Sequence, residues 1–172
     1  MGGMELSLAT SYDASPEEVF AMITDVTFQE QVFQQLRARS YDVSVGDKGD
    51  DVAVQIHWQV AEVPVVARRF VGPRLDLAQS KLWHRAGTDG AREADVDGGV
   101  TGAPGVAGAS VKVTGTTRIL PAGRGTTQAF DLRITASVPV VRGTLEQLVA
   151  DAVRARLENK FKVAARWLSG SL

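Results

Sequence analysis

The strongest constraint on the fold is one long amphipathic stretch near the end of the sequence, from about residue 143 to residue 168. Its apolar residues recur at helical spacing and form one stripe. The stripe comprises Leu145, Leu148, Val149, Ala152, Leu157, Phe161, Ala164 and Leu168. At 1.5 Å per residue the predicted helix is roughly 39 Å long, enough to cross a small domain. An apolar stripe of this length needs a partner surface, and we expect a β-sheet to provide it.

The N-terminal part of the sequence predicts one strand and two short helices. Alternating apolar and polar residues over 6–12 are typical of a half-buried strand. Ser15 is a good N-cap, Pro16 fits the first helical position, and Glu18 stands three residues after the cap. We expect a second helix to begin at Thr27.

The middle of the sequence predicts successive strands separated by Gly and Asp turns. The clearest strand runs over 52–60, with Trp58 on its apolar side and His57 on its polar side. Further strands are expected at about 41–45, 74–84, 92–100, 109–120 and 128–138. Residues 123–125 are expected to form a hairpin turn, and 64–72 a connector or a single helical turn.

This order of elements favours an α+β fold. We expect one curved antiparallel sheet of about seven strands, with two short helices and one long C-terminal helix on the same side, because the apolar sheet face and the helix stripe must cover each other. The length of 172 residues fits a single domain over 1–172.

Composition excludes several classes of function. With no cysteine and only two histidines, thiolate metal sites and disulfides are ruled out, and we expect neither a metal nor another cofactor. The net charge of -1, without a long basic run, argues against a nucleic-acid partner. The sequence shows no secretory signal and no apolar run long enough for membrane insertion, so we expect a soluble, cytoplasmic protein.

Several stretches carry a resemblance to a known superfamily. They are residues 14–25 (ASPEEVFAMITD), 67–72 (ARRFVG), 138–146 (VPVVRGTLE) and the closing Trp167 and Leu168. Together with the order of elements, they make the chain resemble the START/SRPBCC helix-grip superfamily, which includes birch-pollen-allergen-like proteins, polyketide cyclases and lipid-transfer domains. More narrowly, the stretches resemble an uncharacterised bacterial family of unknown function within it. The resemblance implies that a small hydrophobic or lipid-like ligand binds in a cavity between the sheet and the long helix.

Strand alternation and the stripe of the long helix turn a set of residues toward this cavity. Together with Phe70 of the expected connector, we take them as candidate ligand-binding residues. The candidates are Trp58, Phe70, Gln79, Trp83, Val113, Thr117, Phe130, Leu132, Leu148, Val149 and Ala152. Gln79 and Thr117 stand out because a buried amide or hydroxyl is costly unless it is hydrogen-bonded. Inward polar groups therefore indicate a wet or ligand-filled cavity, whereas a strand bulge would turn them outward.

The sequence offers no convincing catalytic residue. His57 and His84 are predicted on the polar faces of their strands, and no nucleophile elbow is present. Acidic residues near the short helices are explained by helix ends, and 98–108 is expected to be a flexible loop because no helix follows it as a phosphate cradle requires. Arg68 and Arg69 could bind an anionic head group at the cavity rim or belong to a solvated connector.

Three functions follow from these observations. The leading hypothesis is non-catalytic binding or transport of a small hydrophobic molecule. The second is a cyclase or aromatase acting on a polyketide-like substrate, for which the superfamily offers precedent. The third is a co-chaperone-like interaction module that uses the outer face of the sheet, where mostly polar residues are predicted.

Overall fold

The computed structural model describes residues 3–106, 111–138 and 140–171. The described part contains one antiparallel sheet of seven strands in the order β1-β7-β6-β5-β4-β3-β2. The strands are β1 (Met4–Tyr12), β2 (Ser40–Lys48), β3 (Asp51–Gln59), β4 (Asp76–Trp83), β5 (Arg92–Gly102), β6 (Val111–Ala122) and β7 (Gly125–Ala136). The helices are α1 (Pro16–Ile23), α2 (Val26–Leu36), α3 (Val65–Val71) and α4 (Arg142–Leu168), with a short 3-10 turn at Pro104–Val106.

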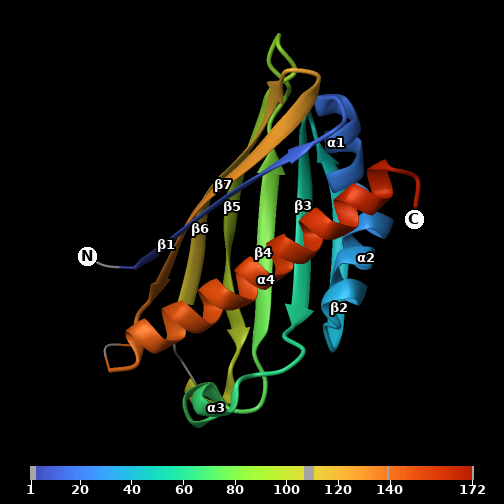
Figure 1. The fold of residues 1–172 in the computed structure, drawn as a ribbon. Helices are drawn as coiled ribbons and strands as arrows, with labels where there is room; N and C mark the ends of the chain where they lie inside the picture. Colours follow the sequence, from blue (N-terminus) through green and yellow to red (C-terminus); the bar gives the residue numbers. More distant parts are fainter. Residues whose placement is uncertain (1–2, 107–110, 139, 172) are drawn as a thin grey trace.

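The long helix α4 runs diagonally across one face of the curved sheet (Figure 1). It packs against α2, β7 and β1. The two short N-terminal helices lie beside its C-terminal end, and α3 lies at one end of the sheet (Figure 1). This arrangement confirms the α+β helix-grip fold predicted from the order of elements. None of the helices in the described residues is both long and apolar enough to cross a membrane.

The short helices begin where polar side chains satisfy their first backbone N–H groups. Ser15 Oγ accepts a hydrogen bond of 3.2 Å from the N–H of Glu18, and Pro16 is the first residue of α1. Asp25 Oδ1 accepts from the N–H of Thr27 at 2.8 Å and from that of Phe28 at 3.3 Å. Asp25 therefore caps α2, which begins one residue before the predicted start at Thr27.

The glycine-rich segment differs from the loop predicted over 98–108. Strand β5 continues to Gly102, so the first part of this segment belongs to the sheet. A Cβ atom on Gly98 would collide with the carbonyl oxygen of Ala78, and one on Gly99 with that of Val111. Glycine is needed here because the backbones of neighbouring strands approach too closely for a side chain. Residues 107–110 lie outside the described part.

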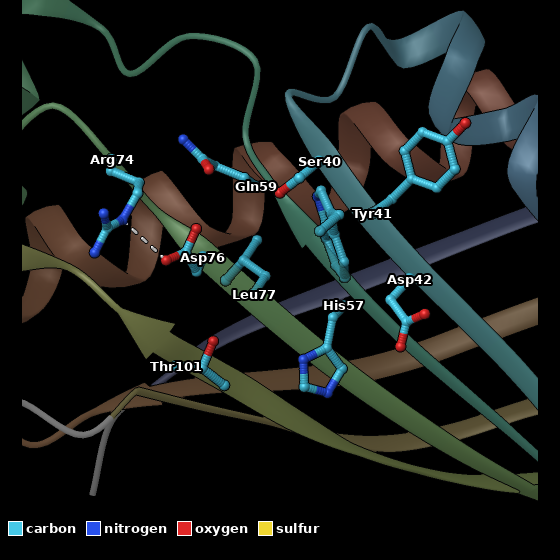
Figure 2. Close-up of a pocket in the computed structure, with 10 residues that line it drawn as sticks. Ser40, Tyr41, Asp42, His57, Gln59, Arg74, Asp76, Leu77 and Thr101 are labelled. Carbon is cyan, nitrogen blue, oxygen red and sulfur yellow. Dashed lines mark ion pairs between the residues drawn. The ribbon is translucent and has the colours of Figure 1, made fainter.

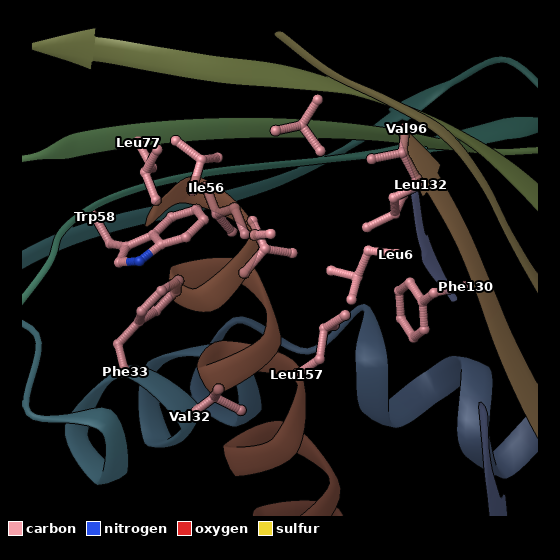
Figure 3. Packing of buried hydrophobic residues seen from close by; sticks show 14 of the residues in the cluster. Leu6, Val32, Phe33, Ile56, Trp58, Leu77, Val96, Phe130, Leu132 and Leu157 are labelled. Carbon is pink, nitrogen blue, oxygen red and sulfur yellow. The ribbon is translucent and has the colours of Figure 1, made fainter. Parts of the chain in front are cut away.

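Large apolar side chains fill the space between the sheet and the helices. Figure 3 shows Phe33 of α2 pointing toward Trp58 of β3, and their ring centroids are 5.6 Å apart. Leu157 of α4 lies between this aromatic pair and the other end of the core, which contains Leu6 and Phe130 (Figure 3). Burial of each such side chain contributes roughly 1.5 to 3 kcal/mol to folding.

Candidate functional site

Strand β4 brings two polar side chains into the interior. Leu77, Gln79, Lys81 and Trp83 alternate with more exposed residues and are all buried on the face that α4 covers. Gln79 is 7% exposed and Lys81 is 4% exposed. The predicted inward position of Gln79 is therefore correct, and Lys81 lies on the same face two residues further along.

Helix α4 places two more cations opposite this strand. Arg156 and Lys160 are four residues apart and therefore lie on one face of the helix. Their exposed fractions are 1% and 0%, so this is the buried face. Three cationic side chains, Lys81, Arg156 and Lys160, are thus enclosed between the sheet and the helices; we call them the interior cations.

Aromatic rings surround the interior cations. The ammonium nitrogens of Lys160 and Lys81 lie 4.8 and 5.1 Å from the centroid of the Phe130 ring. The guanidinium carbon of Arg156 lies 5.4 Å from the centroid of Phe33 and 5.7 Å from that of Trp58. The negative faces of these rings stabilise the cations in part, because each ring carries a quadrupole that attracts positive charge.

A chain of hydrogen bonds holds Lys160 to the sheet. Lys160 Nζ donates to Gln128 Oε1 over 2.8 Å, and Tyr12 Oη donates to the same oxygen over 2.9 Å. Gln128 Nε2 donates to Thr117 Oγ1 over 3.2 Å, and Thr117 Oγ1 donates to the carbonyl of Ala129 over 2.9 Å. Thr117 is inward as predicted, and these partners satisfy its hydroxyl.

Arg156 is satisfied on one side only. Its Nη2 donates to Gln29 Oε1 over 2.9 Å, and Gln29 Nε2 donates to the carbonyl of Ile23 over 2.7 Å. The Nε and Nη1 atoms of Arg156 are buried without a hydrogen-bond partner. Two donor atoms of a fully enclosed guanidinium therefore have no acceptor.

The interior cations have no carboxylate among the described residues to balance their charge. Glu146 is the buried acid found there, and its carboxylate accepts a 2.8 Å hydrogen bond from the N–H of Ala136. Glu146 forms an ion pair with Arg142 at 3.9 Å and with none of the interior cations. Positive charge therefore accumulates in the core.

Burial and mutual repulsion lower the pKa values of the interior cations. Burial lowers the pKa of Lys81 well below 10.5, and the charge of Arg156 lowers it further. Burial lowers the pKa of Lys160 in the same way, with Lys81 and Arg156 adding to the effect. Burial lowers the pKa of Arg156 to about 10. Each shift reflects the cost of holding a charge away from water.

The predicted ligand-binding residues occupy the same interior. Most of them are buried, namely Trp58, Gln79, Trp83, Val113, Thr117, Phe130, Leu132, Leu148 and Val149. Phe70 and Ala152 are only partly buried, and Arg69 stacks over the ring of Phe70 at 4.7 Å. The interior cations and Gln128 are not among the residues predicted from the sequence. Lys81 is two residues from Gln79 and therefore on the same face of the strand, and Arg156 and Lys160 follow Val149 and Val153 at helical spacing. These two patterns could have indicated the interior cations.

A hollow of about 370 Å³ lies between α3 and the first turns of α4. Its lining includes Pro64, Val66 and Ala67 on one side and Thr144, Gln147 and Leu148 on the other. Val66 is 76% exposed and its neighbour Val65 is 75% exposed, so apolar side chains face solvent beside this hollow. We call it the mouth, because the predicted ligand-binding residue Leu148 is part of its lining.

A second hollow, of about 460 Å³, lies over the ends of β2, β3 and β4 (Figure 2). Most of its labelled side chains are polar, and Arg74 Nε forms an ion pair with Asp76 Oδ2 at 3.1 Å. His57 is exposed there, as predicted. This hollow shares only Trp58 with the predicted ligand-binding residues.

His84 is more constrained than the predicted surface position implies. Its side chain is 42% exposed, and Nε2 lies 2.9 Å from Asp95 Oδ2 while Nδ1 lies 3.5 Å from Asp51 Oδ2. The hydrogen bond to Asp95 raises the pKa of His84 above 6.5, with a further contribution from the charge of Asp51. In the described part of the chain, no three His, Asp or Glu side chains converge as a metal site requires.

Comparison with known proteins places the chain in a family. Residues 7–168 match the family described as a protein of unknown function, DUF2505. The chain belongs to this family. The comparison with curated proteins gave no match.

Solved structures show which fold this DUF2505 member has. A Thermus thermophilus protein, TTHA0849, superposes with a TM-score of 0.62 at 19% identity, covering 98% of this chain and 100% of that one. A STAR-related lipid transfer protein from Xanthomonas axonopodis gives 0.61 at 15% identity, covering 96% and 85%. A START superfamily protein from Mycobacterium smegmatis gives 0.53 at 14% identity, covering 97% and 99%. At these identities the likeness shows the fold, which is the helix-grip fold expected from the resemblance.

Proposed function

We propose that this protein binds or carries a small hydrophobic or lipid-like molecule between the sheet and α4 without catalysing a reaction. The observation that carries this proposal is the mouth between α3 and α4. Exposed apolar side chains rarely surround a hollow unless an apolar partner uses them. One of the solved structures with this fold is named as a lipid transfer protein, which supports the same class of function.

The ligand would extend from the mouth along α4. Leu148 borders the mouth, and Val149 and Val153, further along the helix, are buried in the core. Arg156 lies eight positions after Leu148, which is about 12 Å along a helix. A molecule of ordinary metabolite length would therefore be long enough to reach from the mouth to the interior cations.

Entry requires α3 to shift, because the side chains behind the mouth are packed. Helix α3 is suited to this movement: it has only seven residues, and no side chain caps its N-terminal end. Its buried residues are Ala67 and Val71, so little apolar surface holds it in place. Segments with few buried contacts open at low free-energy cost.

The test combines detection of a ligand with obstruction of the mouth. Native mass spectrometry of the purified chain should show a bound apolar molecule, and thermal shifts against aliphatic acids, alcohols and aromatic metabolites should show stabilisation. Thr144→Trp places a ring in the mouth from an exposed position and should weaken binding at least tenfold without changing the unfolding midpoint. Arg154→Trp, on the exposed side of the same helix, is the matched control. If no bound molecule is detected and none of these compounds binds, the proposal is refuted.

A second candidate is an enzyme of the cyclase or aromatase type, and Tyr12 favours it. Burial raises the pKa of Tyr12, so its phenol stays protonated and acts as a hydrogen-bond donor rather than as a general acid. Lys160 shares the acceptor Gln128 Oε1 with it, which places a phenol O–H beside an amine. Incubation with a poly-β-carbonyl compound, followed by mass spectrometry, separates the candidates: the carrier returns the compound unchanged, and the enzyme returns a dehydrated product.

A further inference from the structure

We propose that the ligand of this protein carries an anionic group, a carboxylate or a phosphate, and that Lys81, Arg156 and Lys160 hold that group between β4 and α4. This inference rests on the proposed function and adds the chemical class of the ligand. It also places the anionic end of the ligand deepest in the protein.

The charge of the interior cations is uncompensated. Buried charges are normally paired or neutralised, because moving a lone cation out of water costs several kcal/mol. The three interior cations are 0–4% exposed, and none of them forms an ion pair with a carboxylate of the described residues. They come from two elements, β4 and α4, that face each other across the core. A bound anion would supply the missing charge to all three at once.

Two donor atoms of Arg156 lack an acceptor. Arg156 Nε and Nη1 are enclosed and have no hydrogen-bond partner, whereas Nη2 is held by Gln29. Lysine and arginine side chains are donors only, so the group that completes them must be an acceptor. A carboxylate or phosphate offers several acceptor positions and forms shorter, stronger hydrogen bonds with cationic donors than a neutral oxygen does. A metal cation, a protonated amine or an aliphatic group would satisfy none of these atoms.

Aromatic rings lie next to all three interior cations. Phe130 lies beneath both lysines, and Phe33 and Trp58 flank Arg156. These rings provide apolar surface for the body of the ligand next to the receptor for its charge. The site as a whole therefore matches an amphipathic anion better than an uncharged lipid or a free inorganic ion.

The experiment compares molecules that share one alkyl chain and differ in the head group. The full chain is titrated with dodecanoate, dodecyl phosphate and 1-dodecanol, below their aggregation concentrations, by calorimetry. We expect at least one of the anions to bind roughly 10- to 100-fold more tightly than the alcohol, as charge-assisted hydrogen bonds predict. The two anions distinguish the possible sources: preference for dodecanoate indicates a fatty or aromatic acid, and preference for dodecyl phosphate a phosphorylated lipid.

Substitutions of the interior cations test whether the preference for an anion over 1-dodecanol comes from these residues. Lys160→Met and Arg156→Met should each remove most of the discrimination between anion and alcohol, while affinity for 1-dodecanol changes less than threefold. Lys162→Met, at an exposed position two residues from Lys160, is the matched control and should keep the full preference. Circular dichroism establishes that each variant is folded. If Arg156→Met does not fold, Lys160→Met and Lys81→Met decide the result.

Affinity should also depend on pH in a defined direction. The groups around the anion are Lys81 on β4, Arg156 and Lys160 on α4, and Tyr12 on β1, and burial lowers the pKa of both lysines. An anion favours their charged forms, so its affinity should fall as pH rises above the pKa values of the free protein, whereas that of the alcohol should stay constant.

The outcomes separate the two proposals. Equal affinity for the anions and the alcohol overturns the anion proposal and leaves the proposed function standing. A preference that persists in Lys160→Met and Lys81→Met also overturns it. Absence of binding by all three compounds refutes the proposed function itself.

Discussion

Lys160 donates a hydrogen bond of 2.8 Å to Gln128 Oε1, and both side chains have an exposed fraction of 0%. The same oxygen also accepts from Tyr12 Oη at 2.9 Å. Gln128 therefore keeps a donor when Lys160 is removed. The amide does not need the lysine, so the presence of a buried ammonium has to be explained by something other than local hydrogen bonding.

Replacement of Lys160 by methionine should leave the free protein as stable as before or make it more stable at pH 7. Methionine fills a similar volume, and it removes a buried charge that Lys81 and Arg156 repel. Urea unfolding measures the change, and Lys162→Met should stay within about 0.5 kcal/mol of the parent. A loss of more than about 2 kcal/mol would show that the bond to Gln128 is a structural requirement.

The stability of the free protein should rise with pH over part of the alkaline range. Both lysines have a lower pKa in the folded state than the 10.5 of the unfolded chain, so between the two values the unfolded state binds more protons. Stability is therefore reduced below the folded pKa values and recovers as pH rises through them. The rise ends near pH 10.5, where the lysines of the unfolded chain also lose their protons. Ionisation of the Tyr12 phenol in the unfolded state acts in the opposite direction, because burial raises the pKa of Tyr12 in the folded protein.

Urea unfolding of the parent and of a Lys81→Met, Lys160→Met double variant, measured from pH 7 to pH 10, checks this expectation. The difference in unfolding free energy between the two proteins should shrink as pH increases. A constant difference would mean that both lysines keep ordinary pKa values in the core.

Gln29→Ala should destabilise the protein by about 2 to 3 kcal/mol. The change removes the acceptor of Arg156 Nη2 and the donor to the Ile23 carbonyl, and buried polar groups left without partners are costly. Gln35→Ala is the control, because Gln35 bonds to Arg166 at an exposed position, and a change within about 0.5 kcal/mol is expected. Equal effects of the two substitutions in chemical unfolding would contradict a central role for Gln29.

His84 should titrate above 6.5, chiefly because of its hydrogen bond to Asp95. A raised folded pKa means that its stabilisation is fully present below 6.5 and is lost as pH rises through the folded pKa. NMR titration of the imidazole measures the value directly. Asp95→Asn should lower it, while Asp97→Asn, an exposed change on the same strand, should leave it close to the parent value.

The fold was predictable because its signals are local and periodic. The cap at Ser15 and the apolar stripe of the last helix require only neighbouring residues to be read. The turn at Gly123 is of the same kind, since β6 ends at Ala122 and β7 begins at Gly125. The burial of Gln79 and Thr117 followed from strand parity alone.

The interior cations were harder to predict, because the default position of a charged residue is the surface. Lys81 shares the inward parity of Gln79, but a long side chain can bury its stem and still reach water. Arg156 and Lys160 lie on the same helix face as Val153. The predicted apolar stripe contains Ala152 in place of Val153, and Ala152 is only partly buried. Whether a carboxylate lies near a buried cation depends on which distant elements meet, and no spacing within one segment carries that information.

The position of β1 has a consequence for how the chain is made. In the described sheet its neighbour is β7, and the register joins Met4 to Ile134, which are 130 positions apart. During synthesis the first strand therefore emerges long before its partner exists, and α4, which covers the apolar face, emerges after both. Folding must wait for contacts that close very large loops, which makes it slow compared with a helical protein of the same size. Lys81 is synthesised well before Arg156 and Lys160, so the three charges cannot meet until α4 has been made.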